Sequence, residues 1–357
     1  MLLTYYTIKS RFCLKQHWRW VKVNKTIVVT GGSGFVAGWV IREFLAHGYH
    51  VRTSLRHLNK AAAIRQSVTN GLSDSQRANL SFFEADLTAQ SGWANGMDGA
   101  DGVIHVASPL GTGRETTDEL VKVAKDGTLN VLRAAKMAGI TRVVMTSSQA
   151  ASTPPTSIGA AVLDESYWTS LDNPELDPYR ISKVESERAA WAFAEAQGLA
   201  LTTILPGAIF GPVLSTHSIS SNGILVNFLH RTNVVPKVPL EISDVRDLAR
   251  LHRLAFENPV AIGKRYLAAD QTITMIQVAK LYQQAFPERH LHLMTIPNGG
   301  LRFAAKFIPG LRSLLPMLKR TYHHTTAAVQ NDLGWQQYTP EETVIDAAQS
   351  LIDQGIV

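Results

Sequence analysis

Short apolar runs rich in β-branched residues alternate with stretches of helical spacing through the first two thirds of the chain. The first run, residues 26–30, leads into a glycine-rich turn and then into a helical stretch at 39–45, which Gly48 ends. Six further runs, most of which mix apolar with polar residues, are predicted as strands at residues 49–55, 81–87, 101–109, 141–148, 199–205 and 264–269. The runs at 26–30 and 199–205 are the most apolar, as is typical of strands in parallel sheets covered on both faces. The pattern therefore predicts an α/β fold with a doubly wound parallel sheet.

The rest of the chain has a different pattern, of helices and loops interrupted by prolines. We expect the sheet domain to cover residues 25–206 and to be completed by about 241–270. A smaller C-terminal part, which would bind the substrate, is expected from residues 207–240 and 271–357. Two prolines interrupt the apolar stretch 301–318, so we expect it to pack inside this smaller part rather than lie on a membrane.

The composition of the 357 residues, 45% hydrophobic and 18% charged, is that of a soluble globular protein. The net charge of +6 comes from the first 25 residues, which hold six Lys or Arg and no acid. The rest has 29 basic and 29 acidic residues, so the charge gives no reason to expect a nucleic-acid partner. The single cysteine, Cys13, favours a cytoplasmic location. No apolar run reaches the roughly 18 residues of a membrane span, so stable membrane insertion is not expected.

Residues 1–24 form a basic, aromatic extension without glycine or proline. Its charges are spread along the segment rather than followed by an apolar core, which excludes a secretory signal. A disordered extension is the favoured interpretation, while a membrane-surface anchor and a transit-like segment stay open. Whether the segment belongs to the native protein also stays open, because Val21 or Val23 would be the first residue if its codon is an alternative start.

The turn after the first strand, GGSGFVAG at residues 31–38, has the spacing of a dinucleotide fingerprint in the strand–turn–helix context that gives it weight. Gly31 permits the tight turn. Gly34 lets the backbone approach a pyrophosphate, whose charge is favoured at the N-terminus of the following helix. We therefore predict a dinucleotide site that includes Gly31, Gly34, Phe35 and Val36.

The end of the second strand indicates which dinucleotide is bound. An NAD enzyme usually carries an acid about 20 residues after the glycines, to hold the ribose 2′-hydroxyl. Here no acid occurs between Glu43 and Asp74, and four basic residues fill the gap: Arg52, Arg56, Lys60 and Arg65. A guanidinium at this position suits a 2′-phosphate. The pattern predicts NADPH (NADP+) rather than NADH, with Arg56 as the leading contact.

Two further strand ends are expected to line the cofactor. Asp86 and Leu87 end the third strand, where the Asp86 carboxylate would accept from the adenine amino group. Ala107 and Ser108 follow the fourth strand and would line the cofactor edge. His105, inside that strand, is expected to be a packing residue rather than a catalyst.

The catalytic candidates lie on the fifth strand and on the helix after it. The strand ends in Ser147 and Ser148, and a helical stretch over residues 178–197 begins with Tyr179 and Lys183. Side chains four residues apart share one helix face. An ammonium close to a phenol favours the phenolate, which makes proton exchange easier near neutral pH. No metal site is predicted, because the adjacent histidines at 323 and 324 lack a carboxylate cluster nearby.

Taken together, these motifs resemble the extended short-chain dehydrogenase/reductases, and within them the branch of dihydroflavonol 4-reductase-like and aldehyde (carbonyl) reductases. The matching stretches, in chain order, are TGGSGFV at 30–36, VRTSLR at 51–56, ADL at 85–87, HVASP at 105–109, TSS at 146–148, YRISK at 179–183, PG at 206–207, GP at 211–212 and DVRDLA at 244–249. The resemblance implies a Rossmann-type doubly wound parallel sheet with a smaller C-terminal substrate-binding domain.

The resemblance also implies roles for the matched residues. Tyr179 would be the general acid, and Lys183 would tune it and hold the nicotinamide ribose. Ser148 would orient the carbonyl, with Ser147 as the alternative. Two residues after the sixth strand, Pro206 and Ile209, would shape the nicotinamide end.

Two positions depart from the family pattern. Ala37 replaces the third glycine, and Ala63 stands where flavonol-type relatives carry a lysine that assists the arginine; Lys60 is the candidate substitute.

The sequence therefore predicts an NADPH-dependent oxidoreductase that reduces an aldehyde or ketone, a small-molecule carbonyl substrate, to an alcohol. Two alternatives stay open: a nucleotide-sugar epimerase or dehydratase with tightly bound NAD, and a non-catalytic NAD(P)-binding protein. The sequence does not identify the substrate or the physiological direction. It leaves both a monomer and a homodimer possible.

Overall fold

The computed structural model describes residues 25–357, apart from 110–114, 309–310 and 312–313. The expectation for the N-terminal extension, residues 1–24, falls outside this part of the chain.

A seven-stranded sheet forms the centre of the molecule. Its strands are β1 (Thr26–Val29), β2 (His50–Leu55), β3 (Leu80–Glu84), β4 (Gly102–His105), β5 (Arg142–Thr146), β7 (Ala200–Leu205) and β11 (Arg265–Leu267). The spatial order is β11-β7-β5-β4-β1-β2-β3, and every neighbouring pair is parallel. Each strand coincides with one of the seven runs that the sequence predicts as strands. The predicted fold class is confirmed.

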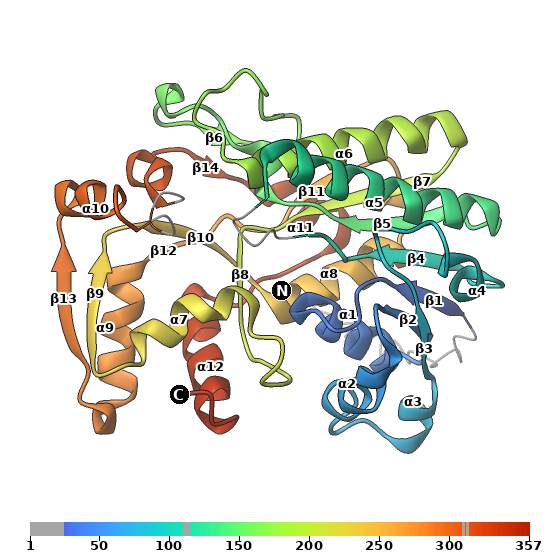
Figure 1. Cartoon of the computed structure of the whole chain (residues 1–357), viewed down its shortest axis with the longest axis horizontal. Helices are drawn as coiled ribbons and strands as arrows, with labels where there is room; N and C mark the ends of the chain where they lie inside the picture. The colour runs from blue at the N-terminus through green and yellow to red at the C-terminus, as the bar shows by residue number, and fades with distance from the viewer. Residues whose placement is uncertain (1–24, 110–114, 309–310, 312–313) are drawn as a thin grey trace, which may run out of the picture.

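Helices cover both faces of this sheet (Figure 1). The elements are α1 (Phe35–Ala46), α2 (Ala61–Val68), α3 (Asp74–Ala78), α4 (Trp93–Met97), α5 (Thr117–Met137), α6 (Pro178–Gln197), α8 (Val245–Glu257) and α11 (Ala327–Leu333). Ile27 and Val29 pack in one core with residues of α1 and α8, while Val28 packs in the other with residues of α4, α5 and α6. The alternation of side chains along β1 thus gives each face of the sheet its own apolar core.

The second part of the molecule lies beside the sheet domain, on the left in Figure 1. Its elements are β8 (Ala208–Phe210), α7 (Gly223–Phe228), β9 (Thr232–Pro236), β10 (Pro239–Asp244), β12 (Thr272–Thr274), α9 (Met275–Ala285), β13 (His292–Ile296), α10 (Asn298–Ala304), β14 (His323–His324) and α12 (Pro340–Asp353). They form a sheet of order β12-β10-β8, the pair β13-β9, and the pair of β14 with β6 (Val162–Leu163).

These small sheets correct the expectation that this region holds only helices and loops. The strands have two to six residues, too few for an alternating pattern to stand out. Pro236 and Pro239, which we took as loop markers, lie at the ends of β9 and β10. Proline is compatible with such strand-end positions.

The two parts share an apolar boundary. Val36, Trp39 and Ile209 pack against the core on the α1 side of the large sheet and also against the core of the second part. The indole of Trp39 donates to the carbonyl oxygen of Pro212 (2.8 Å). The chain returns to the large sheet through α8 and β11. The division of the chain into a sheet domain (25–206, completed by about 241–270) and a substrate-binding part stays a prediction.

The start of α8 holds the C-terminal segment in place. The Arg246 guanidinium pairs with Asp244 and Asp346, each at 2.7 Å. Asp247 is buried, accepts from the backbone N–H of Tyr338 (2.5 Å) and pairs with Arg250 (2.8 Å). Burial, the largest cause, raises the pKa of Asp247 to about 6.

This raised pKa predicts a pH dependence of stability. The folded protein binds the Asp247 proton more tightly than the unfolded chain does, so the contribution of this group falls as pH rises from about 4 to about 6. The difference between the folded and unfolded pKa of Asp247 corresponds to at most about 3 kcal/mol of the free energy of unfolding. The free energy of unfolding can be measured by urea titration at pH 4.5 and at pH 7.5. We expect that of the wild type to fall, relative to that of Asp247→Asn, between the lower and the higher pH. Asp353→Asn, at an exposed position, is the control. A pH-independent difference between wild type and Asp247→Asn would contradict this.

No described helix is long and apolar enough to cross a membrane.

Candidate active site

The candidate site residues lie along one edge of the large sheet. Since all seven strands are parallel, their carboxyl ends meet at that edge. In sheet order, the residues that follow these ends are Pro206 after β7, Ser148 after β5, Ala107 and Ser108 after β4, Gly31 after β1, Arg56 after β2, and Asp86 and Leu87 after β3. The proposed catalytic residue Ser148 thus lies on one side of β1, together with Ala107, Ser108 and Pro206 of the proposed cofactor site, while Arg56, Asp86 and Leu87 lie on the other side.

The glycine turn has the backbone geometry that its sequence predicts. Gly31 has a φ of +74°, and a Cβ there would lie 2.9 Å from the Cβ of Ala107. The Gly31 N–H donates to the Ser54 hydroxyl (2.9 Å), and the Gly34 N–H donates to the Gly31 carbonyl oxygen (2.8 Å). Gly34 is the N-cap residue of α1, without a side chain that caps it. The first N–H groups of α1 therefore keep the capacity to bind a phosphate.

Thr30 and His105 fix the turn to the neighbouring strand. The Thr30 hydroxyl accepts from the N–H groups of Val106 (3.0 Å) and Ala107 (2.9 Å). With both lone pairs used, it donates to Nδ1 of His105 (2.9 Å). Burial lowers the pKa of His105 to about 3, so the ring is a neutral acceptor. His105 is a packing residue, as predicted.

On the proposed nucleotide-binding side, Arg56 and Lys60 are exposed cations and Asp86 is a partly engaged carboxylate. Arg56 is exposed directly after β2. Oδ1 of Asp86 accepts from both the N–H and the hydroxyl of Thr88, each at 2.8 Å. The Thr88 N–H, with a smaller contribution from Arg56, holds the pKa of Asp86 below its usual value. Asp86 is therefore a carboxylate acceptor at this edge of the sheet, in keeping with its predicted role.

The helix α6 brings the tyrosine and lysine together. Asp177 caps it by accepting from the Arg180 N–H (2.8 Å), and Gly198, with a φ of 66°, ends it. Nζ of Lys183 lies 5.5 Å from the centroid of the Tyr179 ring. The same ammonium donates to the Ser108 hydroxyl (2.9 Å), after β4. Lys183 thus connects α6 to the strand end beside the glycine turn.

The structure distinguishes the two serines that end the fifth apolar run. The Ser147 hydroxyl is buried and donates to Oε2 of Glu187 (2.7 Å). The Ser148 hydroxyl is partly exposed and accepts from the Ala150 N–H (3.1 Å), which leaves its own proton available. Of the two, Ser148 is the one placed to donate to a substrate oxygen.

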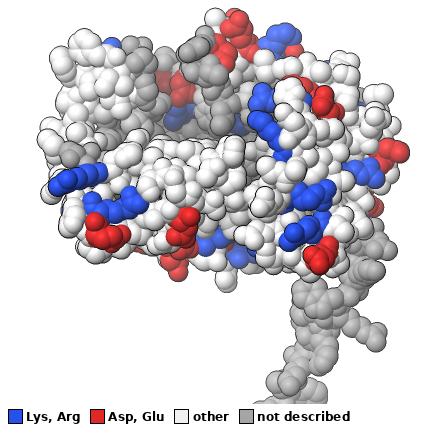
Figure 2. All heavy atoms as spheres, turned by 60° about the horizontal axis from the view of Figure 1, so that its bottom comes forward, with Lys and Arg blue, Asp and Glu red and all other residues white. Residues whose placement is uncertain are grey.

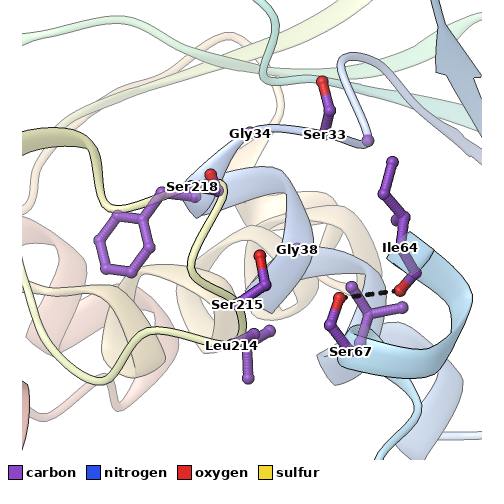
Figure 3. Close-up of a pocket in the computed structure, with 11 residues that line it drawn as sticks. Ser33, Gly34, Gly38, Ile64, Ser67, Leu214, Ser215 and Ser218 are labelled. Atoms are coloured by element: carbon purple, nitrogen blue, oxygen red, sulfur yellow. Dashed lines mark hydrogen bonds between the residues drawn. The ribbon is translucent and has the colours of Figure 1, made fainter. Parts of the chain in front are cut away.

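A pocket lies beside the glycine turn, between α1, α2 and the segment after Pro212 (Figure 3). Of the predicted residues, Gly34 and Phe35 line it, but the side chain of Phe35 is buried in the core of the second part. Ser33 also belongs to the glycine motif at 31–38, whereas no motif marks Ser67, Ser215 and Ser218. These three serines come from two other segments of the chain, which only the fold brings to the glycine turn.

Surface charge and possible metal ligands bear on whether the described part of the chain holds a further site. On the face drawn in Figure 2, Lys and Arg side chains lie in several separate groups with Asp and Glu side chains among them. Among the described residues, no group of three or more His, Cys, Asp or Glu side chains is arranged to hold a metal ion.

The sequence reasoning missed Glu187. It lies on α6, four residues after Lys183, and is fully buried. The signal was present in the spacing, because residues 179, 183 and 187 share one face of the helix.

Comparison with known proteins agrees with this geometry. Residues 27–269 match the NAD dependent epimerase/dehydratase family. The chain belongs to this family, and the resemblance seen in its motifs is confirmed. The prediction that the protein is an NAD(P)-dependent enzyme of the short-chain dehydrogenase/reductase type is also confirmed.

Among individual proteins, the chain is similar to cinnamoyl-CoA reductase 1 of Oryza sativa subsp. japonica, with 32% identity over 74% of this chain and 77% of that protein. Dihydroflavonol 4-reductase of Zea mays is 30% identical, over 74% of this chain and 75% of the relative. Among solved structures, Gre2 of Candida albicans in complex with NADPH has a TM-score of 0.77 and 26% identity, covering 92% of this chain and 99% of the other.

Proposed function

We propose that this protein reduces the carbonyl group of a small aldehyde or ketone with NADPH. The observation that supports the proposal is the hydrogen bond from Lys183 to Ser108, which joins the helix of Tyr179 and Lys183 to the end of β4 (2.9 Å). The exposed Arg56 at the end of β2 favours NADPH over NADH. The similarity to Gre2 of Candida albicans in complex with NADPH supports the same choice.

The residues at the strand ends fit this cofactor. The first N–H groups of α1, among them that of Val36, would face the pyrophosphate, and Gly31 and Gly34 would let the backbone approach it. Arg56 would lie at the 2′-phosphate. Asp86 and Leu87 would lie at the adenine, and Ala107 and Ser108 along the cofactor edge. Lys183, Pro206 and Ile209 would hold the nicotinamide end. When bound, the cofactor supplies the hydride.

The chain itself would handle the proton and the developing charge. The Tyr179 hydroxyl would donate its proton to the substrate oxygen as that oxygen becomes an alcohol. Nζ of Lys183 lies 5.5 Å from the centroid of the same ring, beside the proposed proton donor. The Ser148 hydroxyl would donate to the same substrate oxygen, which orients the carbonyl and stabilises the alkoxide.

We further propose that residues 207–240 and 271–357 hold the substrate over the strand ends. The Ile209 side chain lies at this junction, because it packs against the cores of both parts. Pockets between two parts of a chain are frequent sites for small ligands.

The test is the loss of reduced-nicotinamide absorbance by the purified protein. NADPH and NADH are compared against a panel of aromatic aldehydes, ketoesters and diketones. Substrate-dependent oxidation that prefers NADPH would support the proposal. No oxidation with any carbonyl, together with NAD that copurifies with the protein, would contradict it and favour a sugar epimerase or dehydratase.

Arg56→Ala tests the cofactor contact. Loss of a charge-assisted hydrogen bond costs about 1.5–3 kcal/mol, so KM for NADPH should rise about 10- to 100-fold. KM for NADH should stay nearly constant, since NADH lacks the 2′-phosphate. Arg77→Ala, also exposed, is the matched control. An equal rise in KM for both cofactors would show that Arg56 does not contact the phosphate.

A further inference from the structure

Glu187 is the centre of a buried polar cluster behind the candidate active site. Its carboxylate is fully buried on α6 and accepts from three side chains on other elements. The Ser147 and Thr203 hydroxyls each lie at 2.7 Å, and Nε of Arg265 lies at 2.9 Å. These partners come from the end of β5, from β7 and from β11, so one carboxylate joins α6 to three strands of the sheet.

Arg265 extends this cluster to the segment that follows Ser148. Its guanidinium donates to the carbonyl oxygens of Glu165 (2.7 Å), Tyr167 (2.8 Å) and Ala151 (3.3 Å). It also stacks on the ring of Trp168, at 3.7 Å from the ring centroid. The ion pair between Glu187 and Arg265 thus connects the helix α6, which carries Tyr179 and Lys183, to the backbone just beyond Ser148.

The backbone on either side of Ser148 is fixed to β7. The Ser147 N–H donates to the Ile204 carbonyl oxygen (2.7 Å), and the Gln149 N–H donates to the Pro206 carbonyl oxygen (2.9 Å). The Ser147 side chain, through Glu187, joins this fixed strand end to α6. Glu187 therefore links the strand end that carries Ser148 to the helix that carries Tyr179.

Stability alone does not account for this arrangement. Removing two charges from water is costly, and a well-packed apolar pair serves a core equally well. A reaction in which two hydroxyls donate to one carbonyl oxygen requires more precise placement of side chains than core stability does, because small displacements of the reacting groups reduce the rate strongly.

We propose that Glu187 is a positioning residue that sets the placement of Ser148 relative to Tyr179 and Lys183. This inference rests on the carbonyl reduction proposed above. Glu187 acts through Ser147 and Arg265 and does not itself contact the substrate or the cofactor.

Glu187→Gln tests the proposal, because it keeps the size of the side chain and removes its charge. We expect kcat for carbonyl reduction to fall about 10-fold, while the Kd for NADPH, from fluorescence titration, changes less than about 2-fold. Glu185→Gln is the matched control: the same change on the same helix, at a partly buried carboxylate that pairs with Lys125 at 3.4 Å. This control should keep the wild-type kcat.

A double-mutant cycle with Ser147→Ala identifies the route. If Glu187 acts through Ser147, the losses in kcat of the single variants will not add in Ser147→Ala/Glu187→Gln. Should Glu187→Gln fail to fold because Arg265 is left unpaired, Glu187→Gln/Arg265→Gln removes both charges together. The same selective fall in kcat is then expected.

Three results would overturn the proposal. The first is a wild-type kcat in Glu187→Gln. The second is a fall in kcat that only follows the folded fraction at the assay temperature, with Ser147→Ala unchanged, which would make the cluster merely structural. The third is a wild-type protein that turns over no carbonyl, which would also remove the proposed function. The first two leave carbonyl reduction intact, so the two failures are distinguishable.

Discussion

Replacing Tyr179 by phenylalanine is expected to lower kcat for carbonyl reduction by about 10²- to 10⁴-fold, the usual contribution of a general acid. The ring and its contact with Lys183 remain in this variant, so only the proton donor is lost. Cofactor affinity should therefore stay close to that of wild type. Steady-state kinetics measures the first effect, and NADPH fluorescence titration measures the second.

Tyr338→Phe is the control for this experiment. Tyr338 is exposed and its ring stacks under Arg246, so the same loss of a hydroxyl takes place in the C-terminal segment. It should keep the wild-type kcat. Full activity in Tyr179→Phe would remove Tyr179 as the acid and would require another proton donor.

Lys183→Met should reduce kcat/KM for NADPH by a factor similar to that expected for kcat in Tyr179→Phe, but it should also weaken cofactor binding. The ammonium is nearly buried, donates to Ser108 and lies over the Tyr179 ring. Its removal would cost the contact with the phenol and the proposed contact with the nicotinamide ribose; at about 1.5–3 kcal/mol for each of these two interactions of a charged group, the expected fall is about 10²- to 10⁴-fold. Unlike Tyr179→Phe, this variant should also bind NADPH more weakly, because Lys183 would hold the nicotinamide ribose.

Lys125→Met is the matched control for the lysine. Lys125 lies on α5 and pairs with Glu185 of α6 at 3.4 Å, away from Ser108. Kinetic constants close to wild type are expected for it. If Lys183→Met lowered kcat but left the Kd for NADPH unchanged, Lys183 would act on the tyrosine alone.

The central sheet was predictable because its strands carry their own signal. The most apolar of them, such as β1 and β7, read as buried strands by themselves, and the chain alternates the strands with helices. The predicted helix at residues 178–197 is α6, with the capping residues Asp177 and Gly198 at its two ends. Local chemistry alone fixed these elements.

Features that depend on contacts between distant segments were not predictable in the same way. Strands such as β9 and β13 pair over about 60 residues of sequence, and neither has a recognisable pattern by itself. The choice between Ser147 and Ser148 depended on Glu187, which comes from another element. The position of each site residue in the chain was thus predictable, but its partners across the fold were not.

The order of the strand ends has a consequence for how such an enzyme diversifies. Arg56 follows β2 and Pro206 follows β7, four strand spacings apart, which is about 19 Å at the usual distance between strands. Substitutions at one end therefore leave the other end untouched. Replacements around Arg56 that change which dinucleotide is preferred can therefore be acquired without disturbing the nicotinamide end, where the proposed reaction takes place, on one unaltered framework.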